Sequence, residues 1–172
     1  LPIIDLAAPA LKQLSKAQLD EFNTLLTLLI KSDGVIDRFE WVFVSVIQKH
    51  LAPPNLKNAR AKLSLLSDSA SLVLAMLAYY GTTERRGAEL AYKSGAESCS
   101  LKQLKIPEIS SCTIENLNGA IKKLQQLRFS DRERFLLACE MVVVHDEQIT
   151  TTEAEVIRAI GDLLDCPIPM FG

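Results

Sequence analysis

The sequence predicts an all-α protein, folded as a single bundle of about seven helices. Apolar residues recur at helical spacing through most of the chain, and no segment shows the alternation of apolar and polar residues that a half-buried strand requires. The two ends of the chain also repeat one helix–turn–helix pattern. With 172 residues, of which 48% are hydrophobic, the chain is long enough for a single domain, residues 1–172, with its own core.

The repeat relates a unit at about residues 15–54 to a second unit at about residues 130–167. In both, a tight turn is followed by a capping residue and by a glutamate three positions later. The matched pairs are Asp33 and Asp146, Ile36 and Ile149, Asp37 and Thr150, and Glu40 and Glu153. A proline stops each unit. Each end of the chain is therefore expected to form two helices joined by a short turn.

In the first third of the chain, residues 1–14 predict a short helix or arm that covers the core. Ser15 and Gln18 have the spacing of a capping box, which opens the next helix. Its apolar stripe is Leu19, Phe22, Leu25, Leu26, Leu29 and Ile30. Asp37 is expected to cap the following helix, with an inward stripe of Phe39, Phe43, Val46, Ile47 and His50.

In the middle of the chain, residues 55–66 fit either a helix or an extended connection. Residues 68–80 are apolar on nearly every side, which is typical of a central helix surrounded by others. Thr82 and Thr83 can cap a helix over residues 84–97, and residues 98–111 predict a loop.

The last third predicts three more helices. Ser111 or Thr113 opens the first, which runs to Leu127, and the sequence Ser130-Asp131-Arg132-Glu133 has the pattern of a capping box that opens the second. Thr150 and Glu153 open the last. We expect the apolar faces of the helices to meet in one buried cluster that includes Leu26, Phe43, Leu74, Leu77, Cys139, Val143, Ile157 and Ile160.

Composition narrows the classes of partner. The net charge of −2 and the lack of a basic run argue against nucleic acid and anionic lipid. The longest uncharged stretch, residues 69–83, is too short and too polar for a membrane span. No signal peptide is evident, and the chain starts without methionine, which suggests a fragment. Four separated cysteines without a Cys-x-x-Cys pair indicate a reducing, cytosolic environment.

The acidic turns have two interpretations. Carboxylates at Asp33, Asp37, Glu40, Asp146 and Glu153, with the hydroxyl of Thr150, are oxygen ligands of the kind that Ca²⁺ or Mg²⁺ prefers. Their spacing is too short for an EF-hand. The pattern is better explained by helix capping, in which Asp37 and Thr150 accept amide hydrogens and the two glutamates reach back. A weak metal site is the minority alternative.

No catalytic set stands out. His50 and His145 are the two histidines, and the chain has no His-Glu-x-x-His motif, which a zinc protease needs to place two imidazoles on one ion. Trp41 lies off the main apolar stripe of its helix. It is either partly buried under a loop or an anchor for a partner, because tryptophan is enriched at interface hot spots.

Two segments carry a resemblance to a known family: residues 1–15 with 29–40, and residues 149–153 with 158–169. Both are similar to the C-terminal region of bacterial integral-membrane zinc metallopeptidases of the HtpX and CAAX-protease type. The Asp-Gly-x-Ile-Asp-x-x-Glu turn at Asp33–Glu40 also resembles the TerB-like helical fold of tellurite-resistance proteins.

The resemblance implies a TerB-like bundle without catalysis of its own, since the catalytic zinc of that family lies in the preceding membrane-embedded part. The expected function is a regulatory or partner-binding domain on the cytoplasmic side, tethered to the inner membrane through a parent chain involved in proteolysis. It needs no cofactor, and it binds a protein partner or the rest of its own chain. The alternative is a stand-alone TerB-like stress-response protein that binds a divalent metal through its acidic turns, positions thought to attract such ions in that family.

Overall fold

A computed structural model describes residues 2–31, 38–51, 60–82, 84–102, 105–146 and 150–166. These residues form eight α-helices and three short 3₁₀ helices, and they contain no β-strand. The predicted all-α class is confirmed. The chain divides into two compact units, residues 1–56 and residues 57–172, and each is described by itself. None of the described helices combines the length and the apolar character that a bilayer crossing requires.

The first unit contains α1 (Pro2–Leu11), α2 (Lys16–Lys31) and α3 (Arg38–Leu51). The predicted capping box before α2 is present: the Ser15 amide donates to Gln18 Oε1 at 2.9 Å, and the Gln18 amide donates to Ser15 Oγ at 3.3 Å. Helix α3 contacts both α1 and α2. The segment expected to be a short helix or arm thus contains a helix, α1.

The stripe predicted for α3 is partly wrong. Phe43, Ile47 and His50 are only partly buried, whereas Trp41, Val42 and Val44 are buried. A single stripe is the signature of a helix with one neighbour, and α3 has two within its own unit. Because α3 is covered on more than one side, it buries residues that the predicted single stripe left out.

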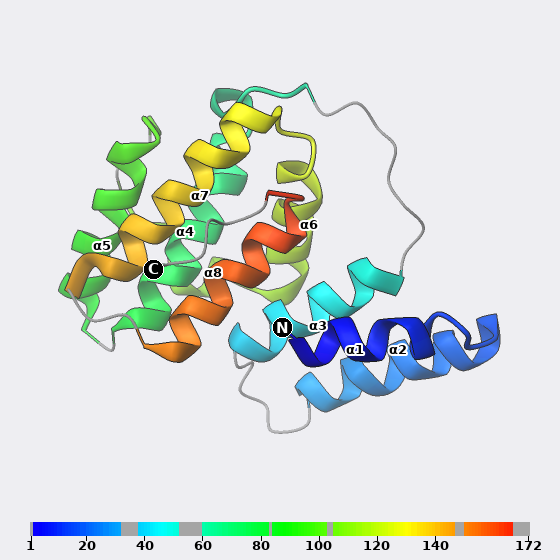
Figure 1. Ribbon diagram of the computed structural model, residues 1–172. Coiled ribbons are helices and arrows are strands. Elements are labelled where there is room, and N and C mark those ends of the chain that lie inside the picture. The colour runs from blue at the N-terminus through cyan, green and yellow to red at the C-terminus, as the bar shows by residue number, and fades with distance from the viewer. Residues whose placement is uncertain are drawn as a thin grey trace. The chain divides into compact units, whose positions relative to one another are not determined.

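The second unit is built around α4 (Ser67–Gly81), which contacts α5 (Arg85–Ser98), α6 (Ile114–Leu124) and α7 (Phe129–Val143). Helix α8 (Thr151–Leu163) packs on α7. Figure 1 shows α7 crossing in front of α4, with α5 and α6 on either side. Nine residues of α4 are buried, which confirms the central helix that its all-round apolar sequence predicts.

Of the eight residues predicted for the core, six lie in the second unit and are all buried: Leu74, Leu77, Cys139, Val143, Ile157 and Ile160. Leu26 and Phe43 belong to the first unit and are only partly buried. The single domain and the TerB-like fold stay predictions.

The structure also describes parts of two connections, one predicted as either helical or extended at residues 55–66 and one predicted as a loop at residues 98–111. Residues 52–59 lie outside the described part, but residues 60–62 are extended rather than helical. The Ala61 amide donates to Gln126 O at 2.9 Å, and the Arg128 amide donates to Ala61 O at 3.0 Å, which makes an isolated parallel bridge. A 3₁₀ turn, η1 (Leu63–Leu65), then leads into α4. Residues 99–102 and 105–108 are non-helical, as predicted for the loop, and η2 (Ile109–Ser111) ends it.

Small residues allow α5 and α7 to approach closely. Gly95 of α5 lies against α7: a Cβ added there would meet Val142 and would stand 2.7 Å from the Ala138 carbonyl oxygen. Because that oxygen belongs to the backbone of α7, the clash could be relieved only by moving one helix. At Gly119 of α6, by contrast, an added Cβ would meet no atom within 4 Å.

We therefore expect opposite results from the same substitution at these two glycines. Gly95→Ala should destabilise the protein by about 1–3 kcal/mol, because overpacking outweighs the better helix propensity of alanine. Gly119→Ala should stabilise it by about 0.5–1 kcal/mol, because alanine loses less backbone entropy in a helix. Urea unfolding of the two variants measures both changes, and a loss of stability for both would contradict the packing argument.

Candidate functional site

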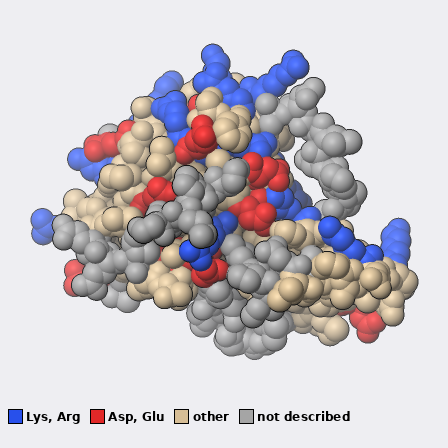
Figure 2. All heavy atoms as spheres, in the orientation of Figure 1, with Lys and Arg blue, Asp and Glu red and all other residues tan. Residues whose placement is uncertain are grey.

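A cluster of charged side chains in the second unit lies where α7 begins and the chain enters α4. Lys and Arg side chains gather along this upper edge of the molecule in Figure 2. Asp131, the third residue of α7, has a side chain that is 1% exposed. A carboxylate buried this deeply requires hydrogen bonds or counter-charges to remain ionised.

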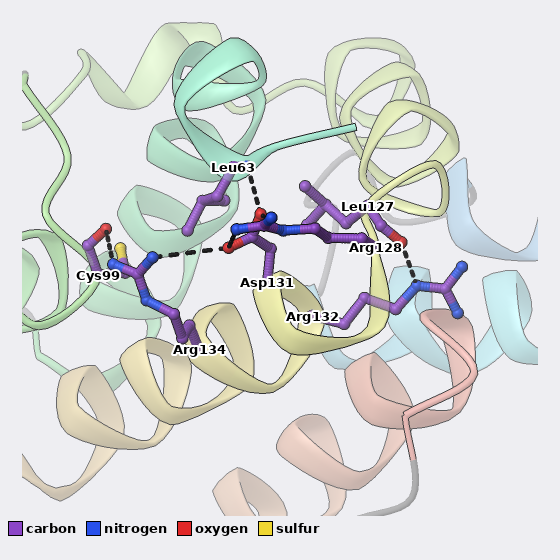
Figure 3. A network of polar contacts seen from close by, with 7 residues as sticks. All are labelled: Leu63, Cys99, Leu127, Arg128, Asp131, Arg132 and Arg134. Carbon is purple, nitrogen blue, oxygen red and sulfur yellow. Dashed lines mark hydrogen bonds and ion pairs between the residues drawn. The ribbon is translucent and has the colours of Figure 1, made fainter. Parts of the chain in front are cut away.

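Asp131 has three partners from different parts of the unit (Figure 3). Arg128 Nε donates to Oδ2 at 2.7 Å, and its second nitrogen donates to Oδ1 at 3.4 Å. The Leu63 amide donates to Oδ2 at 3.2 Å. Arg134 lies one helical turn further along α7 and forms an ion pair with Oδ1 at 3.5 Å. Burial by itself would raise the pKa of Asp131, but these hydrogen bonds and the two guanidinium charges hold the pKa below its usual value.

Arg134 and Arg132 extend the cluster to other segments. Arg134 also donates to the Cys99 carbonyl oxygen at 3.4 Å, which links α7 to the loop after α5. Arg132, on the other side of α7, donates to the carbonyl oxygens of Leu127 at 2.8 Å and Gln125 at 2.7 Å. It also donates to Leu164 O at 2.6 Å, so it joins the end of α6 to the end of α8.

An open pocket of about 160 Å³ lies beside this cluster. It is bordered by η1, the first residue of α4, the loop after α5 and the first turns of α7. The lining residues are Lys62, Leu63, Ser64, Ser67, Cys99, Ser100, Leu101, Lys102, Arg128, Asp131 and Arg134. Four cations and one carboxylate leave a surplus of positive charge, although the whole chain has a net charge of −2.

The capping box predicted at Ser130–Glu133 is wrong. Helix α7 begins at Phe129, its N-cap is Arg128, and no side chain caps it. Asp131 instead accepts from Leu63, which is distant in sequence. The tertiary contact competes with the local one because the extended residues 60–62 bring the Leu63 amide to the first turn of α7. The sequence signal for this cluster is an aspartate with arginines three residues before and after it, a spacing that places all three on one helical face.

The sites predicted in the acidic turns are only partly within the described residues. Asp33 and Asp37 lie outside them, as do the side chains of Glu40 and Asp146. In the second turn, the capping box is confirmed: Glu153 donates its amide to Thr150 Oγ1 at 3.2 Å, and Thr150 donates its amide to Glu153 Oε2 at 2.9 Å. Glu153 is buried, and its carboxylate accepts hydrogen bonds from the amide and the hydroxyl of Thr150.

The remaining sequence candidates are placed as follows. Trp41 is 1% exposed, so its side chain is packed rather than presented at the surface; a partner-binding role for it stays a prediction. His145 is exposed in η3 (Val144–Asp146), and His50 is in the last turn of α3. Within the described residues, no three His, Cys, Asp or Glu side chains are grouped as metal ligands would be.

The buried cysteines behave as small apolar groups. Burial raises the pKa of the thiols of Cys99, Cys139 and Cys166. A raised pKa keeps each sulfur protonated at neutral pH, and a protonated thiol is a poor nucleophile.

A comparison with protein-family models, with curated proteins and with solved structures finds no match to this chain.

Removing the buried carboxylate should destabilise the protein in a pH-dependent way. Asp131→Ala leaves the Leu63 amide without its acceptor, and we expect a loss of about 1–3 kcal/mol at neutral pH. The folded-state pKa of Asp131 lies below its ordinary value of 3.8, so its contribution is complete above that value and is lost as the pH falls through the folded pKa. The difference between wild type and variant should therefore shrink below about pH 4. Asp68→Ala, which removes an exposed aspartate in the first turn of α4, is the control. A pH-independent difference would contradict the assignment.

A second prediction separates capping from metal binding at Thr150 and Glu153. Thr150→Ala should cost about 1 kcal/mol and Thr150→Ser much less, because a hydroxyl still accepts the Glu153 amide. Glu153→Gln should be nearly neutral, since glutamine also completes a capping box. The measurement is thermal unfolding with and without added Ca²⁺. If Ca²⁺ stabilised wild type and not Glu153→Gln, the metal interpretation would replace the capping one.

Proposed function

We propose that this chain is a non-catalytic, partner-binding domain, and that the partner docks on the outward face of α7. The observation that carries the proposal is a stripe of four large apolar side chains that α7 and the residue after it expose: Phe129, Leu137, Met141 and Val144. Leu137 is 57% exposed and Met141 is 48% exposed. Their spacing follows the helical repeat, so all four fall on one side of the helix. Single exposed apolar residues are ordinary, but Leu137, Met141 and Val144 lie on successive turns, and such a group is typical of an interaction surface.

Charge identifies the chemistry of the partner. Glu133 and Glu140 share the exposed face with this stripe, and neither forms an ion pair with another described residue. Partial burial raises the pKa of Glu140. A cation from a bound partner would lower that pKa again. A helix that presents apolar residues flanked by Lys or Arg would cover the stripe and neutralise both carboxylates. We therefore propose a basic amphipathic helix as the partner.

The resemblance to the C-terminal region of membrane zinc metallopeptidases supplies a setting for this partner. The basic helix would belong to a separate protein or to the membrane-embedded remainder of a longer chain, with this domain tethered on the cytoplasmic side of the inner membrane. Zinc and proteolysis would belong to that other part. The metal-binding alternative has less support, since Thr150 and Glu153 already satisfy each other.

The proposal is tested with a synthetic amphipathic helix of leucine and lysine, titrated into the 172-residue chain. We expect saturable binding that weakens at high salt, because the rim contacts are ionic. The double variant Leu137→Ser/Met141→Ser should lose at least about tenfold in affinity, as apolar anchors at an interface do. Calorimetry or fluorescence anisotropy gives the affinities.

Two controls are matched to this variant. Leu90→Ser removes an apolar side chain of similar exposure, 49%, from α5 and should leave binding unchanged. A peptide with glutamate in place of lysine should not bind. Equal binding of the acidic peptide, or an equal loss from Leu90→Ser, would overturn the proposal.

A further inference from the structure

The pocket beside Asp131 carries an arrangement of charge that the partner-binding face does not use. Two of its cations, Arg128 and Arg134, are held by the Asp131 carboxylate on the pocket wall. The other two, Lys62 and Lys102, are exposed and have no ion-pair partner among the described residues. Both guanidinium groups are therefore ordered before any ligand arrives, and both ammonium groups remain available to one.

Asp131 orders the arginines without using all their donors. Arg128 directs Nε and one terminal nitrogen to the carboxylate, and Arg134 directs one terminal nitrogen to it and the other to Cys99 O. The remaining N–H groups include the other terminal nitrogen of Arg128 and Nε of Arg134, for which the described residues provide no acceptor. A guanidinium whose orientation is already fixed loses less entropy when it binds an anion.

Neutral donors add to the cations. The hydroxyl-bearing residues Ser64, Ser67 and Ser100 all line the pocket. Ser67 is the first residue of α4, and no side chain caps this helix, so its first amides are not bonded by a cap. The positive end of a helix dipole favours an anion at this position.

Ser100 has a backbone conformation that supports a role in the pocket. Its φ is 59°, in the left-handed region, and it occupies the position after α5 where glycine is usual. The motif is complete: the Ser100 amide donates to Glu97 O at 3.0 Å, and the Leu101 amide donates to Ala96 O at 2.8 Å. A serine there keeps a side chain that glycine would not provide, at the cost of local strain. Asp165, with a φ of 51° after α8, has the same conformation outside the pocket and offers a control.

The size of the pocket limits the ligand. A volume of about 160 Å³ is more than a bound water needs and is below the roughly 300–1,000 Å³ of pockets for drug-sized ligands. An extended polyanion is disfavoured by the net charge of −2 on the chain. A single compact group with more than one negative charge matches the surplus of cations better than one carboxylate does. Forked guanidinium groups also match the geometry of phosphate oxygens.

We propose that this pocket binds the phosphate group of a small phosphorylated ligand. Arg128 and Arg134 contact the phosphate oxygens from the α7 side, and Lys62 and Lys102 close on it from η1 and the loop after α5. The serine hydroxyls donate the neutral hydrogen bonds. Free phosphate and a phosphomonoester share this chemistry, and the experiment distinguishes them.

The test is a titration of the 172-residue chain with inorganic phosphate and, separately, with glycerol 3-phosphate, followed by heteronuclear NMR or calorimetry. Sodium chloride keeps the ionic strength constant. We expect saturable binding, with shifts confined to residues that line the pocket. Equal affinity for the two ligands assigns recognition to the phosphate group alone, and tighter binding of the ester shows that the pocket also contacts its organic part. A response that chloride reproduces overturns the proposal.

Variants exclude a general effect of charge or unfolding. Lys62→Gln/Lys102→Gln should weaken phosphate binding about tenfold or more, whereas Lys122→Gln/Lys123→Gln, which removes two exposed lysines of α6 outside the pocket, should not. Ser100→Gly should raise the melting temperature while weakening phosphate binding. Asp165→Gly, which also removes the ion pair between Asp165 and Arg132, should leave phosphate binding unchanged. Equal weakening by the two lysine pairs, or full affinity in both Lys62→Gln/Lys102→Gln and Ser100→Gly, would contradict the proposed site.

Discussion

The buried carboxylate of Asp131 is the interaction on which the organisation of the second unit depends. An ionised group that is 1% exposed cannot be left without donors, so its partners are obligatory. It requires the Leu63 amide, which places the entry to α4 beside the first turn of α7. It also requires Arg128 and Arg134, and Arg134 in turn holds the loop after α5 through Cys99. One side chain thus joins three segments that are far apart in sequence.

The same cluster determines where positive charge gathers on this unit. Because Asp131 neutralises only one of the two arginines that it orients, positive charge remains at the rim of the pocket. Apolar packing alone would not produce this result, because apolar contacts have little directional preference. Close approach at Gly95 sets the distance between α5 and α7, and the ionic cluster sets which end of α7 carries the polar groups.

The two surfaces of α7 have different physical character. Its N-terminal turns face an ionic pocket, while its outward side exposes Leu137 and Met141 beside two carboxylates. Helix α7 has a low contrast between its faces because apolar residues occur on both sides of it. Such a sequence predicts a buried helix, yet the exposed half shows that only part of its apolar surface is used within the fold. The proposed docking of a basic amphipathic helix would cover this unused half.

Sequence by itself determined the all-α class, the central position of residues 68–80 and the capping boxes at Ser15 and Thr150. These features depend on spacings within one helix or one turn, which periodicity and local hydrogen bonding define. Tertiary structure decided the role of Asp131, whose expected local cap gave way to the Leu63 amide 68 residues away. It also decided that α3 buries residues outside the predicted stripe, including Trp41. The exposed side of α7 was likewise decided by the tertiary structure. Each of these depends on which segments become neighbours, and no local pattern in the sequence contains that information.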